Sequence, residues 1–187
     1  MKLTTRILSR IAVLGALVVV FDYTLKFSGL KIPFPWYPRL KFDFTGIPIV
    51  LSLLLFGLKP GAFTSAVALF AILVRSGDVI GASMKALAEF STILGMSMGL
   101  IQFRKTAKPS KPTKPISFIL GCTLRVIVMA FANLPVSVVY YGFPLEAAVS
   151  LSPFIAAFNV SQSFVSMFGG YLVYEAVIRR APSLATT

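Results

Sequence analysis

The sequence contains no histidine, a single cysteine and only six acidic residues among 187. Without histidine, the commonest general base and metal ligand is missing, and the lone Cys122 cannot form an intramolecular disulfide bond. The chain also lacks a Gly-x-x-x-x-Gly-Lys-Ser/Thr phosphate-binding loop, so it does not itself hydrolyse ATP by that route. We therefore expect no metal site, no resident cofactor and no enzymatic activity.

Apolar residues are present in large excess. Hydrophobic residues make up 57% of the chain, and charged residues only 13%, where soluble domains have about 25%. The mean hydropathy of +0.86 fits a chain that spends most of its length in hydrocarbon. This composition disfavours a soluble enzyme, a disordered tail and a disulfide-stabilised scaffold together.

Six apolar segments predict an all-α integral membrane protein with six transmembrane helices, in a single domain spanning 1–187. The predicted helices are residues 6–27, 46–57, 61–75, 79–103, 116–141 and 151–178. The first segment could be mistaken for a signal peptide, but Asp22, Tyr23 and Lys26 follow it instead of a small-residue cleavage site. The second and third look short, since the twelve residues of the second reach only about 18 Å of a roughly 30 Å hydrocarbon core. The pair must either lean on the other four helices or extend a turn beyond these bounds.

The basic residues, which give a formal net charge of +12, predict the orientation in the membrane. With the N-terminus in the cytoplasm, eleven Lys and Arg lie inside and five outside, which favours both termini inside. The five outer ones are Lys26, Lys31, Arg39, Lys41 and Arg75. Because the cations lie mainly between apolar runs, we expect the lipid bilayer and no nucleic acid as a partner. The proline-rich basic segment 108–115 is interpreted as a solvated connector.

The outer loop 29–45 is the least helix-like part of the chain. Three prolines flank Trp36 and Tyr37 in this loop. Such a loop could form an aromatic lid over a binding site that faces outward. Equally, tryptophan and tyrosine favour headgroup depth, so the pair could be an interfacial belt.

The last predicted helix carries four polar residues at helical spacing. Asn159, Gln162, Ser163 and Ser166 follow an i, i+3, i+4, i+7 pattern and therefore share one face. An unpaired amide in hydrocarbon costs several kcal/mol, so this face should contact protein or a wet cavity. Contacts between helices would explain it, but four polar residues in the outer half favour a ligand surface.

Charged residues also occur inside the predicted membrane helices. Lys85 and Glu89 are one turn apart on helix four, and they are expected to pair with each other or to hold a polar ligand. Asn133 lies just before Pro135, which breaks helix five and favours a polar cavity there. Arg125 lies nearer the inner end of helix five and is interpreted as snorkelling to the headgroups.

The first helix has three small residues that would allow close approach of another helix. Ala12 and Ala16 are four residues apart, and Gly15 lies beside them. Such a pattern supports packing by van der Waals contact, either within the chain or against a partner.

Several short motifs occur in an order and spacing that carry a family resemblance. They are Leu40-Lys41-Phe42-Asp43-Phe44-Thr45-Gly46-Ile47-Pro48, Phe56-Gly57-Leu58-Lys59-Pro60-Gly61 and Gly81-Ala82-Ser83-Met84. The last helix also resembles a Pro-Phe-Asn-x-x-Lys pattern. Over nearly its whole length, the chain resembles the substrate-binding S-components of energy-coupling-factor (ECF) vitamin transporters, and the riboflavin-specific branch most.

The resemblance implies a six-helix protein of the prokaryotic plasma membrane that binds a vitamin near its outer side. Its implied partners are a transmembrane coupling subunit, docked on an Ala-x-x-x-Ala face at Ala12 and Ala16, and two ATPase subunits. Asn133 and Asn159 match asparagines that contact the flavin. The implied ligand-binding set also includes the following residues: Trp36, Tyr37, Leu40, Asp43, Lys85, Glu89, Gln162, Ser163 and Ser166.

Three positions depart from the riboflavin pattern. Gly46 replaces an aspartate, Glu89 replaces an asparagine, and Gln162 replaces a lysine. Riboflavin is the first expected substrate, and hydroxymethylpyrimidine, pyridoxine and pantothenate are the alternatives. Two other classes are a small membrane enzyme that uses Lys85 and Glu89 and an accessory membrane protein with no saturable ligand.

Overall fold

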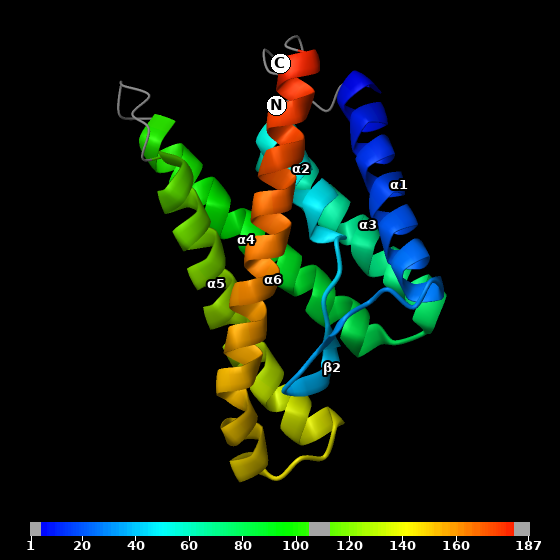
Figure 1. Ribbon diagram of the computed structural model, residues 1–187, viewed down its shortest axis with the longest axis vertical. Coiled ribbons are helices and arrows are strands. Elements are labelled where there is room, and N and C mark those ends of the chain that lie inside the picture. The colour runs from blue at the N-terminus through cyan, green and yellow to red at the C-terminus, as the bar shows by residue number, and fades with distance from the viewer. Residues whose placement is uncertain (1–4, 105–112, 182–187) are drawn as a thin grey trace.

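Six α-helices and a small β-hairpin make up residues 5–104 and 113–181, which the computed structural model describes (Figure 1). The elements are α1 (Thr5–Phe27), β1 (Pro33–Phe34), β2 (Tyr37–Lys41), α2 (Gly46–Phe56), α3 (Leu58–Ser76), α4 (Val79–Arg104), α5 (Thr113–Pro135), the π-helix η1 (Val136–Tyr140) and α6 (Leu145–Arg180). All six predicted helices occur in the predicted order. Residues 108–112 of the predicted connector lie outside the described residues, and 113–115 already belong to α5.

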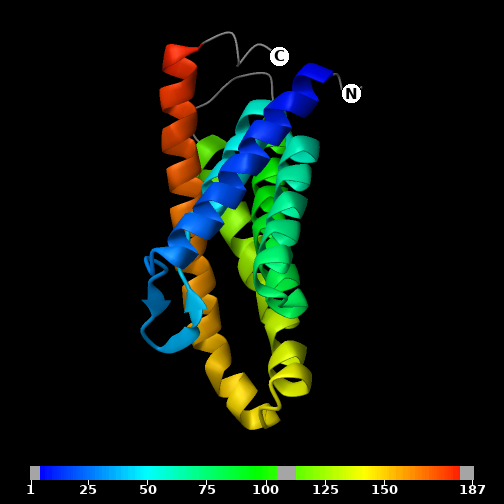
Figure 2. The same cartoon turned by 90° about the vertical axis from the view of Figure 1, so that its right-hand side faces the viewer.

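The start of α1 and the end of α6 lie at the same end of the bundle, which we call the terminal end (Figure 1). The hairpin and the turn between η1 and α6 lie toward the opposite end, which we call the hairpin end. The hairpin lies beside α6 (Figure 2). Its two short strands pair antiparallel, within a fold that is otherwise helical, as predicted.

Five of the helices are long and apolar enough to cross a membrane, which makes this a multi-pass membrane protein. The third helix begins at Leu58 rather than residue 61, so its 19 residues are sufficient. Among the six α-helices of the described residues, α2 with its 11 residues is the one too short to span the bilayer. Helix α6 begins six residues before its predicted start and continues through Pro153.

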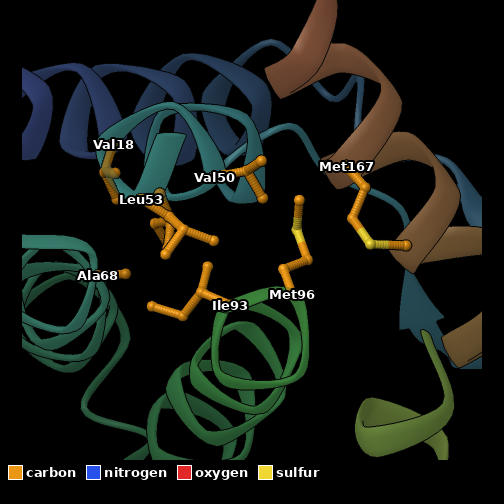
Figure 3. Packing of buried hydrophobic residues seen from close by; sticks show 8 residues of the cluster. Val18, Val50, Leu53, Ala68, Ile93, Met96 and Met167 are labelled. Carbon is orange, nitrogen blue, oxygen red and sulfur yellow. The ribbon is translucent and has the colours of Figure 1, made fainter. Parts of the chain in front are cut away.

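The short helix α2 is held at the centre of the bundle. Buried Ile49, Val50 and Leu53 of α2 pack with apolar side chains of four other helices (Figure 3). These neighbours are Val18 of α1, Ala68 of α3, Ile93 and Met96 of α4 and Met167 of α6. Close packing on all sides therefore compensates for the small number of turns in α2.

At Pro135, where a break was predicted, the chain changes from an α-helix to a π-helix. Proline has no backbone N–H, so it cannot donate the usual bond to the carbonyl one turn back. Helix α5 ends at this residue, and the chain continues as η1, where the N–H of Tyr141 donates to the carbonyl of Val136 at 3.1 Å. The chain thereby reaches the hairpin end without a loop.

Helices α4 and α5 approach closely through glycine, and this contact gives a testable stability prediction. A Cβ atom on Gly95 would overlap the carbonyl oxygen of Leu120 and lie 2.9 Å from Cα of Gly121. We expect Gly95→Ala to lower the free energy of unfolding by about 1–3 kcal/mol, because backbone must move. Met98→Ala, at an exposed position of α4, is the control. Thermal melts in detergent measure both, and equal melting temperatures would contradict the prediction.

Candidate ligand-binding site

A cavity of about 370 Å³ lies at the hairpin end, between the hairpin loop and the bundle. Its lining comes from the end of α1, the segment 31–43, α3, α4, α5, η1 and α6, so it is a convergence point of the fold. This volume falls within the range of about 300–1,000 Å³ that is usual for small-molecule sites. Six of the predicted ligand-binding residues line it, namely Tyr37, Leu40, Asp43, Lys85, Asn133 and Asn159.

A chain of buried ion pairs forms one wall of this cavity. Nζ of Lys85 lies 2.8 Å from Oε1 of Glu89, which confirms the predicted pairing within helix α4. The same ammonium lies 2.8 Å from Oδ1 of Asp43, 42 positions earlier in the chain. Lys85 therefore ties the loop after the hairpin to α4.

Arg125 belongs to this network, so its interpretation as a snorkelling residue is wrong. Its side chain is buried, with 1% of the residue exposed, and Nη1 lies 3.0 Å from Oε1 of Glu89. Its Nε donates to Oδ1 of Asn159 at 3.0 Å, and Nη1 donates to Oγ1 of Thr92 at 3.2 Å. The residue lies twelve positions into α5, about 18 Å from the helix start, too deep to reach the headgroups.

The predicted polar face of α6 is buried, but only one of its four residues lines the cavity. Gln162 donates from Nε2 to the carbonyl of Asp43 at 2.8 Å and accepts from the backbone N–H of Asp43 at 3.3 Å. Ser163 donates to the carbonyl of Asn159, and Ser166 accepts from Gln162. For these three residues the ligand-surface prediction is corrected. Gln162 fixes the loop at Asp43 to α6, and Ser163 and Ser166 make hydrogen bonds within α6. Asn159 lines the cavity.

The aromatic residues of the hairpin divide in the same way. Trp36 is 64% exposed, packs edge-on against Phe34 with 5.1 Å between ring centroids, and does not line the cavity. Tyr37 lines it. Of the two aromatic residues, only Tyr37 is therefore placed to cover a ligand in the cavity, and Trp36 lies on the outer surface of the hairpin.

Two positions that depart from the riboflavin pattern lie against each other. A Cβ atom on Gly46 would come within 2.5 Å of Oε2 of Glu89 and closer still to Oγ of Ser166. That glutamate oxygen is buried and has no hydrogen-bond partner among the described residues. Gly46 thus provides the space that Glu89 occupies, and the two departures form one local arrangement.

Sequence reasoning missed several cavity residues. Arg39 of β2 stacks over the ring of Tyr141, 4.5 Å from its centroid, and both line the cavity with Met129 of α5 and Phe158 of α6. The Tyr140-Tyr141 pair just after the Pro135 break is the signal that could have indicated them. On the α1 side, buried Asp22 accepts from Lys31 and from Nε of Arg75, each at 2.5 Å.

Two groups outside the membrane helices have shifted pKa values. Burial by itself raises the pKa of Asp43, but the charge of Lys85 and hydrogen bonds from Lys85 and Thr45 outweigh it and hold the pKa below its usual value. Burial, together with the charge of Asp78, raises the pKa of Tyr141. At neutral pH the cavity therefore presents an Asp43 carboxylate and a neutral Tyr141 phenol.

The small residues of α1 face in two directions. Ala12 and Ala16 are exposed, beside the exposed Val13 and Val20. Gly15 is buried, and a Cβ there would lie 3.3 Å from the side chain of Val67 on α3. Gly15 therefore serves packing within the bundle, which corrects its place in the predicted docking face.

Comparison with known proteins gives a likeness to a solved structure. No family model matches the sequence, and no curated protein matches it. A solved structure described as "Structure and mechanism of the S component of a bacterial ECF transporter" is similar, with a TM-score of 0.74 and 22% sequence identity over 94% of this chain and 96% of that one. The chain therefore has the fold of an S component.

Proposed function

We propose that this protein is the substrate-binding subunit of an ECF-type importer, and that it binds a vitamin in the hairpin-end cavity. The observation that carries the proposal is the placement of this cavity. Amide, phenol and charged groups converge at the end of the bundle opposite the termini, in the fold of an S component. The vitamin is in this proposal a transported substrate and not a resident cofactor.

The side chains around the cavity support reversible binding. Asn133 donates from Nδ2 to the carbonyl of Met129 at 2.7 Å, and its Oδ1 makes no hydrogen bond among the described residues. This oxygen can accept from a heterocycle, while Tyr37 and Leu40 cover the ligand from the loop. Lys85 and Glu89 are held in ion pairs that fix the wall, which favours a binding role over enzymatic turnover.

The remaining machinery lies in other subunits under this proposal. A transmembrane coupling subunit docks on α1 at Ala12 and Ala16, and two ATPase subunits supply the energy that reorients the protein in the membrane. The terminal end faces the cytoplasm of a prokaryotic cell, as the excess of inner cations favours, so the cavity opens outward. No nucleic acid takes part.

A vitamin titration tests the proposal. Trp36 is the only tryptophan and lies in the hairpin turn outside the cavity, so its fluorescence reports on changes in the hairpin when ligand binds, and isothermal titration detects binding that leaves it unchanged. We expect saturable binding of one vitamin per chain without ATP and without chemical change. Riboflavin comes first, followed by its 5′-phosphate, hydroxymethylpyrimidine, pyridoxine, pantothenate and nicotinate. Binding of none of them would contradict the proposed function.

A further inference from the structure

All five basic residues that the orientation rule places on the outer side line the cavity. They are Lys26, Lys31, Arg39, Lys41 and Arg75, and the membrane-embedded Lys85 and Arg125 join them. The positive-inside rule gives no reason for basic residues at the outer end. These residues come from α1, the hairpin region and α3, yet all five converge on a single cavity. This convergence indicates that they interact with a ligand in that cavity.

Carboxylates offset only part of this charge. Asp43 and Asp78 line the cavity, and Asp22 and Glu89 are ion-paired to lining residues from behind. Against seven cations these four acids leave an excess of three positive charges. The pairing is also uneven: Asp43 and Glu89 balance Lys85 and Arg125, whereas Asp22 is shared by Lys31 and Arg75.

Three cations at the mouth of the cavity have no acidic partner among the described residues. Lys26 and Lys41 are exposed at the rim, and Arg39 contacts the aromatic rings of Tyr141 and Phe143 instead of a carboxylate. Deeper in the cavity, apolar and amide side chains such as Met129, Ala88 and Asn133 lie beside the ion-paired Lys85 and Arg125. Unpaired cations at the mouth thus lead to an interior in which Lys85, Asp43 and Arg125 are held in ion pairs.

We propose that the substrate is an organic anion whose carboxylate or phosphate is held by these mouth cations while its uncharged part enters the deeper cavity. This inference rests on the proposed function and names the chemical class of its substrate. Clustered like charges beside a low-dielectric wall focus a positive potential, which raises the local concentration and affinity of an anion. Riboflavin is neutral, so its phosphate ester or a carboxylate vitamin fits the cavity better.

Matched pairs of compounds separate charge from shape. The pairs are riboflavin 5′-phosphate with riboflavin, pantothenate with pantothenol, and nicotinate with nicotinamide. Binding is measured by isothermal titration to the whole chain in phosphatidylcholine nanodiscs. We expect the anionic member of at least one pair to bind about tenfold or more tightly than the neutral one. Its affinity should fall with salt, since screening shortens from about 30 Å at 0.01 M to about 8 Å at 0.15 M.

Variants that remove positive charge test which cations bind the anion. The double variant Lys26→Gln/Lys41→Gln keeps the side-chain length and should weaken binding of the anion about tenfold, with no effect on a neutral ligand. Lys59→Gln, an exposed lysine at the terminal end, is the matched control. Thermal melts verify that the variants are folded.

The outcomes separate this inference from the proposed function. If the neutral member of every binding pair binds as well as the anion, the anionic substrate is overturned and the vitamin-binding role stands. If no compound binds, the proposed function falls, and this inference falls with it.

Discussion

Replacing Arg125 with leucine is expected to destabilise the protein by about 3–5 kcal/mol. The guanidinium lies 3.0 Å from Oε1 of Glu89, and this carboxylate is fully buried with its other oxygen already unpartnered among the described residues. Without Arg125, the negative charges of Asp43 and Glu89 share only Lys85. An uncompensated buried charge is expensive, and the loss of the hydrogen bond to Asn159 adds to it.

A double-mutant cycle distinguishes this explanation from simple loss of packing. In Arg125→Leu/Glu89→Gln, the remaining pair of Lys85 and Asp43 is again balanced, so much of the lost stability should return. Arg180→Leu, at an exposed position near the end of α6, is the control and should change stability by less than about 0.5 kcal/mol. Chemical or thermal unfolding in detergent gives the values. A wild-type melting temperature for Arg125→Leu would refute the account.

The position of Arg125 illustrates what local sequence patterns can and cannot predict. The pairing of Lys85 with Glu89 was predictable, because residues four apart in a helix are neighbours. The third and fourth members of the network are 42 and 36 positions from their partners, so no spacing rule connects them. The sequence also did not give the depth of Arg125 in the membrane. That depth follows from the start of α5 at Thr113, which places Arg125 too far from the headgroups to reach them.

The helices and the hairpin differ in predictability for a related reason. Long apolar runs indicate helix regardless of the rest of the fold, and α1 and α4 begin and end within one residue of their predicted bounds. The hairpin contains Pro33 and Pro38, and proline cannot donate to a strand ladder, so local propensity argues against strands there. The packing of this segment against α6, through Gln162 and Asp43, makes up for that weak propensity.

The polar face of α6 shows the same limit at the site itself. Burial of all four residues followed from the cost of unpaired amides in hydrocarbon. Which of the four lines the cavity depends on where the loop at Asp43 contacts α6, because that loop occupies Gln162 and leaves Asn159 at the cavity. That loop is 119 positions away from Gln162, so spacing on one helix could not separate Asn159 from its neighbours.

Bulky substitutions on α1 are expected to abolish uptake while leaving ligand binding intact. Ala12 and Ala16 are exposed on one face of α1, so a tryptophan at either position can extend away from the bundle. If the coupling subunit docks there, as proposed, close helix approach needs small side chains, and Ala12→Trp or Ala16→Trp prevents it. Uptake should then fall to the background of cells that lack the protein, while the dissociation constant of the purified variant stays within about twofold of the wild type, a difference of about 0.4 kcal/mol.

A matched substitution elsewhere separates docking from a general effect of tryptophan in the membrane. Ala130 is exposed on α5, on the other side of the bundle from α1 (Figure 1). Ala130→Trp should therefore preserve both binding and uptake. Full uptake by Ala12→Trp and Ala16→Trp would show that the coupling subunit docks elsewhere. Loss of binding together with uptake would mean that this face of α1 supports the fold, because a surface used only for docking has no influence on the cavity at the hairpin end.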